Sequence, residues 1–174
     1  MRASRLVGFG MLIVLVDLRY EGFDFVVDLV GWAMAYAGLR KLYVLDQAFR
    51  TAAGFAFLGA ATAVAELLPP FAGWLGVLET IAWAGVVIPA CTGLLRVAER
   101  AGDRRIANYA RRLRSAEFVA VVMALLIGWG IDAEGGLGLV AFLTVALGFA
   151  TAVLFILLML SSSRPATRSS QAST

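Results

Sequence analysis

The sequence Arg96–Arg114, RVAERAGDRRIANYARRLR, is the long polar stretch around which the rest of the chain is organised. It carries seven arginines against only Glu99 and Asp103, and it is flanked on each side by an apolar run long enough to cross a bilayer. Loops on the cytoplasmic side of membrane proteins carry an excess of Lys and Arg. The stretch is therefore predicted to lie on the cytoplasmic face and to fix the side on which every other loop lies.

The composition also indicates a membrane protein. Of the 174 residues, 61% are hydrophobic and 16% are charged, whereas soluble domains average about 45–50% apolar and about 25% charged residues. One cysteine, Cys91, and no histidine provide neither a disulfide framework nor the usual Cys/His metal site. We expect no cofactor, no metal and inert packing of Cys91.

Six apolar stretches predict an all-α, integral membrane bundle of six transmembrane helices in one domain, residues 1-160, followed by a disordered cytoplasmic tail, residues 161-174. The predicted spans are residues 6-20, 23-39, 51-68, 73-95, 115-131 and 137-160. The first is interpreted as an uncleaved span, because no small-x-small cleavage site follows it. In the fourth span, Pro89 frees a helical carbonyl group, to which Thr92 is expected to donate.

Counting the basic residues predicts the threading. We place six spans in a bacterial plasma (inner) membrane with both termini in the cytoplasm. In this arrangement, 14 of the 15 basic residues lie on the cytoplasmic side and Arg19 alone lies on the outer side. A five-span arrangement puts the N-terminus and the arginine stretch on opposite sides and fails the same count.

The acidic residues suggest a candidate ion or proton site on the outer side. Glu66 and Glu79 lie inside apolar runs on adjacent predicted helices joined at Pro69 and Pro70. A carboxylate within a membrane is costly unless it pairs, faces water or takes up a proton, so such an acid is a functional hypothesis by default. The members of the candidate site are Asp17, Asp24, Asp28, Glu66 and Glu79, whereas Asp46, Glu99, Asp103 and Glu117 are predicted to lie toward the inner side. The alternative is that Glu66 and Glu79 reach the interface, the latter if its helix begins near Val77.

Small residues recur at helical spacing in two predicted spans. The pairs are Ala56 with Ala60 and Gly59 with Ala63, and the second stripe is Thr144, Gly148 and Ala152. Such spacing lets two helix backbones approach closely in lipid. It is expected to serve packing within the bundle or with a partner.

The stretch FDFVVDLVGWAMAYAGLRKL, residues 23-42, carries acidic and glycine residues at a characteristic spacing. It resembles a segment of small multi-pass bacterial integral membrane proteins of unassigned function, in which the pattern runs Asp-x-x-Pro-Asp-x-x-Gly-Tyr, then Gly-Leu and a basic end. The matching residues are Asp24, Asp28, Gly31, Gly38 and Leu39, while Val27 and Trp32 replace the proline and the tyrosine. The resemblance covers about 20 residues and implies a membrane location without an activity.

The second half of the arginine stretch has the pattern of an amphipathic helix. Apolar or aromatic residues recur at three- and four-residue spacing: Ile106, Tyr109, Ala110 and Leu113. The surrounding basic residues are Arg104, Arg105, Arg111, Arg112 and Arg114. The pattern predicts a helix on the inner leaflet that contacts anionic lipid; an acidic partner protein is the alternative. Nucleic acid is not expected, since Tyr109 is the single aromatic platform.

No catalytic motif is present: the sequence has no phosphate-binding glycine loop followed by Lys, no H-E-x-x-H and no G-x-S-x-G. The chain is therefore not expected to be an enzyme. Two functions remain open. One is a non-catalytic membrane component that packs with itself or with a membrane partner, and the other is a small cation- or proton-coupled transporter or channel-like protein that uses the outward-facing carboxylates.

Overall fold

The computed structural model describes residues 3–16, 24–65, 72–128 and 137–161, apart from the side chains of residues 24–26, 72–74, 128 and 137–141. The described residues form six α-helices and no strand, which confirms the all-α class for this part of the chain. The helices are α1 (Ala3–Val16), α2 (Asp24–Leu42), α3 (Ala48–Ala65), α4 (Ala72–Arg100), α5 (Arg104–Gly128) and α6 (Leu137–Ser161).

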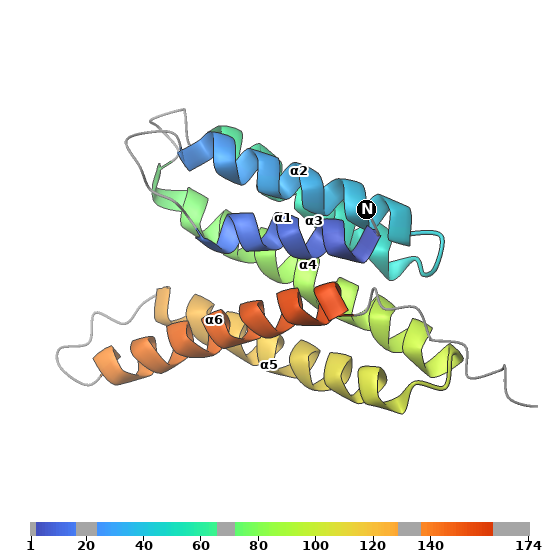
Figure 1. Cartoon of the computed structure of the whole chain (residues 1–174). Helices are drawn as coiled ribbons and strands as arrows, with labels where there is room; N and C mark the ends of the chain where they lie inside the picture. Colours follow the sequence, from blue (N-terminus) through green and yellow to red (C-terminus); the bar gives the residue numbers. More distant parts are fainter. Residues whose placement is uncertain (1–2, 17–23, 66–71, 129–136, 162–174) are drawn as a thin grey trace, which may run out of the picture.

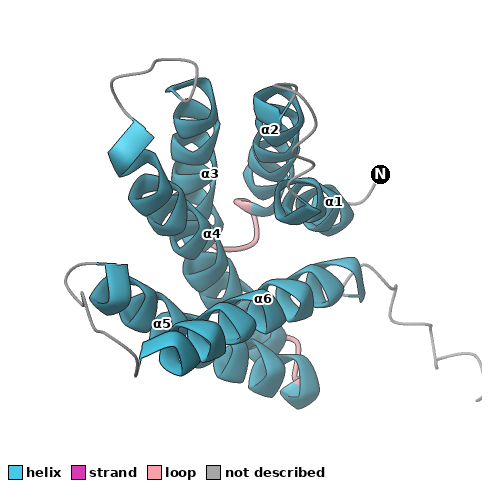
Figure 2. Ribbon diagram, turned by 90° about the vertical axis from the view of Figure 1, so that its left-hand side faces the viewer, coloured by secondary structure: helices cyan, strands magenta, loops and turns pink. Residues whose placement is uncertain are grey.

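Successive helices run in opposite directions, so the chain goes up and down through one bundle (Figure 1). Each helix packs against the next in the sequence, and α1 also packs against α6, which closes the six helices into a ring. Figure 2 shows α5 and α6 as a pair set apart from α1–α3, with the long α4 running between the two groups. The arginine-rich turn between α4 and α5 lies at the same end as the α2–α3 connection (Figure 1).

Three helices are long and apolar enough to cross a membrane: Ala48–Ala65, Leu75–Arg100 and Phe142–Ser161. Of the six predicted spans, length and composition support these three among the described residues. The helix α1 has only 14 described residues, α2 carries Arg40 and Lys41 in its last turn, and α5 begins with two arginines. The helix α1 is thus apolar but short, whereas charged residues lower the hydropathy of α2 and α5, and all three pack beside the three long apolar helices.

The arginine stretch is not a loop followed by a separate surface helix, as the sequence pattern predicted. The helix α4 continues to Arg100, α5 begins at Arg104, and α5 runs without a break into the predicted fifth span. The turn between them contains Gly102 at a φ of 74°, a left-handed conformation that glycine adopts at little cost. Asp103 Oδ1 accepts the backbone N–H groups of Arg105 at 3.1 Å and Ile106 at 3.0 Å, which caps α5.

Glycine residues allow α1 and α2 to pack backbone against backbone. A Cβ atom on Gly10 would lie 2.5 Å from the carbonyl oxygen of Gly31 and 2.6 Å from the amide nitrogen of Ala35. On Gly38, it would lie 2.8 Å from the carbonyl oxygen of Ala3. The absence of side chains at these positions therefore lets the two helix backbones come into direct van der Waals contact.

Aromatic rings fill the glycine positions of the neighbouring interfaces. A Cβ on Gly59 of α3 would meet the Trp32 ring of α2 at 2.5 Å, and one on Gly85 of α4 would meet the Phe55 ring of α3 at 2.2 Å. Trp32 is 1% exposed. Its ring lies edge-on to that of Trp83 on α4, with 6.4 Å between the centroids. The first stripe of small residues therefore serves packing within the bundle.

Helix α4 passes through Pro89 without a break. Proline cannot donate to the carbonyl four residues earlier, which belongs to Gly85. The Thr92 hydroxyl donates instead to the carbonyl oxygen of Ile88 at 2.9 Å. The expectation that Thr92 bonds to the carbonyl freed by Pro89 is thus wrong, because the hydroxyl reaches back four residues from its own position.

Candidate functional site

A groove of about 380 Å³ lies between α1 and the three consecutive helices α4, α5 and α6. Its walls come from the last described turn of α1, from α4 near its beginning, from the second half of α5 and from the first half of α6. The residues that line it are Val14, Leu15, Glu79, Thr80, Trp83, Glu117, Ala120, Val121, Ala124, Thr144, Val145, Gly148, Phe149 and Ala152. The lining is thus apolar and aromatic, with two carboxyl groups and two threonine hydroxyls.

Helical periodicity brings the walls together. On α6, Thr144, Gly148 and Ala152 share one face because they recur every four residues, and all three line the groove. Within the described chain no helix packs closely on the centre of this stripe, because a Cβ atom on Gly148 would meet no atom within 4 Å beyond its own helix backbone; packing of the stripe with a partner stays a prediction. The absence of a side chain at this position leaves space rather than a contact.

Glu117 is the most deeply buried charged residue described, with 2% of its surface exposed. It accepts a hydrogen bond from the Thr151 hydroxyl of α6 and one from the side chain of Trp83 on α4. The Thr151 hydroxyl also lies 2.8 Å from the carbonyl oxygen of Gly148. This hydroxyl has one proton and two oxygen neighbours. When it donates to Gly148, it is able to accept a hydrogen bond from a protonated Glu117, so the site accommodates Glu117 with or without a proton.

Sequence reasoning missed Glu117 as a site residue. It placed this glutamate at the inner end of a helix that was expected to begin near Ser115. Because α5 begins at Arg104, Glu117 lies about 20 Å along the axis from that end and about 16 Å from Gly128. A signal was present in the spacing: Glu117 follows Ala110 and Leu113 at the three- and four-residue intervals of one helix face.

Glu79 is the member of the predicted acidic site that lines the groove. It is half-buried and lies about two turns after the beginning of α4 at Ala72. The predicted position of Glu79 along the helix is confirmed, and the alternative start of this helix near Val77 is wrong; its depth in a membrane stays a prediction. Next to it, the Thr80 hydroxyl donates to the carbonyl oxygen of Gly76 at 2.8 Å.

The other predicted acids do not join Glu79 in the described part of the groove. Asp28 is buried on α2, with 9% exposed, and is not among the lining residues. Asp17 and Glu66 lie outside the described residues, as does the side chain of Asp24. Within the described residues, the groove therefore pairs Glu79 with Glu117 rather than with the acids that the sequence grouped around it.

The arginine end of the bundle is held by ion pairs. Asp46, in the α2–α3 connection, bonds with Arg100 and lies 3.4 Å from Arg96, and its Oδ1 also accepts the Ala48 amide at 3.0 Å. Across the α4–α5 turn, Arg111 lies 3.0 Å from Glu99. These exposed arginines contribute only about 0–1 kcal/mol per pair, so their main structural effect is to fix which loops meet at this end.

The predicted amphipathic stripe faces the protein rather than a lipid surface. Ala107, Ala110 and Leu113 are at most 4% exposed, and Ile106 packs against the same core. Tyr109 departs from this stripe and is 51% exposed. Cys91 is likewise buried, at 1%, in agreement with a packing position.

Comparison of the chain with protein-family models, with curated proteins and with solved structures gives no match.

Proposed function

We propose that this chain is a six-span integral membrane protein of a bacterial plasma membrane that binds a small organic cation in the groove and carries it in exchange for protons. The observation that carries the proposal is the presence of Glu79 and Glu117 in one apolar groove between α1, α4, α5 and α6.

The packing supports membrane insertion of all six helices. Successive helices run in opposite directions (Figure 1), and the three long apolar helices, α3, α4 and α6, pack directly beside α1, α2 and α5. The second half of α5 also exposes apolar side chains, among them Phe118 at 60% and Leu126 at 58%. In water such a face is unfavourable, whereas lipid tails cover it without cost. We propose that both termini and the arginine end face the cytoplasm; a reporter fused to the C-terminus should be active inside the cell, and activity in the periplasm contradicts this threading.

The chemistry of the lining favours a cation with an apolar body. A carboxylate in an apolar setting is costly without a partner of opposite charge or a proton. The neighbouring rings of Trp83 and Phe149 offer aromatic faces that attract cations, most strongly where water is excluded. Apolar walls with a few polar groups are typical of sites for small organic molecules.

The geometry around Glu117 supports exchange with protons. Because the Thr151 hydroxyl has Gly148 and Glu117 as alternative partners, loss or gain of a proton at Glu117 requires only a rotation of that hydroxyl. An incoming cation can then replace the proton as the partner of the carboxyl group. We propose that the site binds and exchanges its ligand without chemical conversion.

We favour cation exchange over a non-catalytic role in packing with another chain. The small residues that motivated such a role are used within the bundle at Gly59 or line the groove at Gly148. A packing component has no need of two carboxyl groups in one groove.

Binding of benzyltrimethylammonium to the detergent-purified protein, followed by isothermal titration calorimetry, tests the proposal. We expect Glu117→Gln and Glu79→Gln each to weaken binding by at least about tenfold, because each removes a charge facing the ligand in a partly dehydrated site. The matched control is Glu99→Gln, which changes a glutamate outside the groove and should leave affinity unchanged.

A second variant tests the place of binding without altering charge. Gly148→Leu fills free space in the groove and should weaken binding while the melting temperature is maintained. In proteoliposomes, uptake of the same cation should depend on an outward proton gradient. Absence of binding by the wild-type protein, or equal losses in Glu99→Gln and Glu117→Gln, overturns the proposal.

A further inference from the structure

A second groove, of about 290 Å³, lies between α5 and α6. Its lining residues are Tyr109, Arg112, Leu113, Ala116, Leu147, Ala150, Thr151 and Leu154. Helix α5 carries its polar members, Tyr109 and Arg112, near the arginine end, whereas the α6 side is apolar except for Thr151.

The polar and apolar parts of this groove are separated along the helix axis. The bond between Glu117 and Thr151 fixes the antiparallel register of α5 and α6, which places Leu147 about one turn farther from the arginine end than Thr151. Ala116 lies about 10 Å along α5 from Tyr109. The groove thus begins with a guanidinium and a phenol and continues between aliphatic side chains.

We propose that this groove binds one anionic phospholipid, with its phosphate at Arg112 and Tyr109 and an acyl chain along Leu147, Ala150 and Leu154. The order of charge and apolar surface in the groove matches the order of headgroup and chain in the lipid. A guanidinium binds a phosphate oxygen through charge-assisted hydrogen bonds, and the phenol supplies a further donor.

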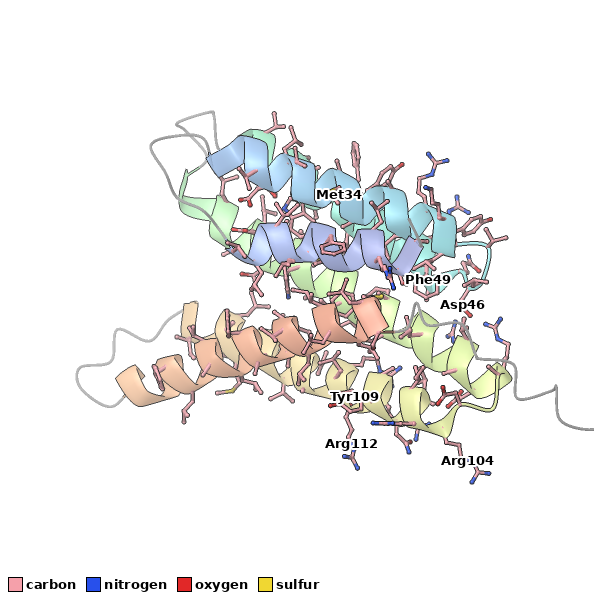
Figure 3. The ribbon with its side chains drawn as sticks, in the orientation of Figure 1. Met34, Asp46, Phe49, Arg104, Tyr109 and Arg112 are labelled. Carbon is pink, nitrogen blue, oxygen red and sulfur yellow. The ribbon has the colours of Figure 1, made fainter. Side chains whose placement is uncertain are left out.

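Arg112 differs from its arginine neighbours on α5. Arg111 pairs with Glu99 at 3.0 Å, and Arg114 donates to the Thr92 hydroxyl on α4 at 3.5 Å. Arg112 is exposed and makes no ion pair among those recorded for the described residues. Figure 3 shows Arg112 and Tyr109 extending from α5 on the side away from α1–α3. Of the five arginines predicted to contact lipid, Arg112 alone lines this groove.

The surface around the groove is suited to lipid. On α6, Leu147 is 37% exposed and Leu154 is 38% exposed, and the adjacent Leu157 and Phe118 are more exposed still. A protein ligand would have to cover this apolar face and the guanidinium together, whereas lipid already surrounds a membrane helix. The inference does not depend on cation binding in the first groove.

Native mass spectrometry of the full chain, with dioleoylphosphatidylglycerol and dioleoylphosphatidylcholine added to separate samples, tests this site. We expect one phosphatidylglycerol molecule to be retained with a preference of about fivefold over phosphatidylcholine, the size expected for one arginine near an anionic headgroup. Arg112→Gln should remove the preference, and Arg112→Lys should keep most of it. Arg104→Gln is the matched control, because Arg104 belongs to the same helix and does not line the groove.

Ala150→Leu should weaken retention of both lipids by filling the apolar part. Equal preference for the two lipids in wild type, or loss of the preference in Arg104→Gln as large as in Arg112→Gln, shows diffuse attraction to the arginine end and overturns the proposal. Retention of lipid in Ala150→Leu at the wild-type level contradicts the place assigned to the acyl chain.

Discussion

Gly59 on α3 and Gly148 on α6 occupy the same kind of sequence pattern, a small residue four positions from another, yet their surroundings are opposite. A Cβ on Gly59 would collide with the Trp32 ring at 2.5 Å, whereas one on Gly148 would enter open space. At Gly59 the absence of a side chain lets α3 pack closely against α2, whereas at Gly148 it leaves open space in the groove. Small-residue spacing thus predicts which residues share a helix face, but it does not predict whether a side chain or open space lies opposite that face.

The two regions are connected through tryptophan. Trp32 belongs to the packed region and lies edge-on to Trp83, whose side chain donates to Glu117 in the groove. A substitution that disturbs the packing around Trp32 should therefore also change cation binding in the groove. A substitution that only fills space in the groove is not expected to change the packing around Trp32.

The largest effect is expected for Gly10→Ala. Its Cβ would lie 2.5 Å from the Gly31 carbonyl oxygen and 2.6 Å from the Ala35 amide nitrogen, and backbone atoms cannot rotate away as a side chain does. We expect a loss of about 3 kcal/mol or more in the free energy of unfolding, at the upper end of the range for overpacking. Thermal unfolding in mild detergent measures it.

The control for this variant is Gly54→Ala, where an added Cβ meets nothing within 4 Å. A wild-type melting temperature in Gly10→Ala would show that α1 and α2 do not pack backbone against backbone.

A smaller loss is expected for Gly59→Ala. The added methyl group displaces the Trp32 ring, which has little room because it is 1% exposed, and the cost should be about 1–3 kcal/mol. Since Trp32 contacts Trp83, we also expect weaker binding of benzyltrimethylammonium. Differential scanning fluorimetry and calorimetry on one preparation measure both quantities. A wild-type affinity together with a lowered melting temperature would show that the packing around Trp32 does not affect binding in the groove.

The smallest change in stability is expected for Gly148→Ala, the counterpart of Gly59→Ala. The methyl group enters the groove without a clash, and alanine favours a helix over glycine by up to about 1 kcal/mol. The melting temperature should stay the same or rise slightly. A decrease comparable to that of Gly59→Ala would mean that the groove at Gly148 is closed, and the comparison between the two glycines would fail.

Sequence reasoning found most of the helices and part of the candidate site. It predicted six helices and the position of Glu79 about two turns into α4, since these depend on local apolar runs and on helical rise. It separated one continuous α5 into a surface helix and a span, because a change from charged to apolar residues does not itself end a helix. It grouped Glu79 with acids of the same predicted side, although the described groove brings it to Glu117 on α5.

The helical class, the apolar character and the basic stretch follow from composition and periodicity, which act along one chain segment at a time. Which faces meet depends on the packing of the helices: Arg112 lines a groove while Arg111 pairs with Glu99, and Gly59 contacts a ring while Gly148 leaves a space. Helices in lipid are held by van der Waals fit and hydrogen bonds between particular faces. The rotation and register of each helix against its neighbours set that fit, and neither is encoded in the pattern of a single helix.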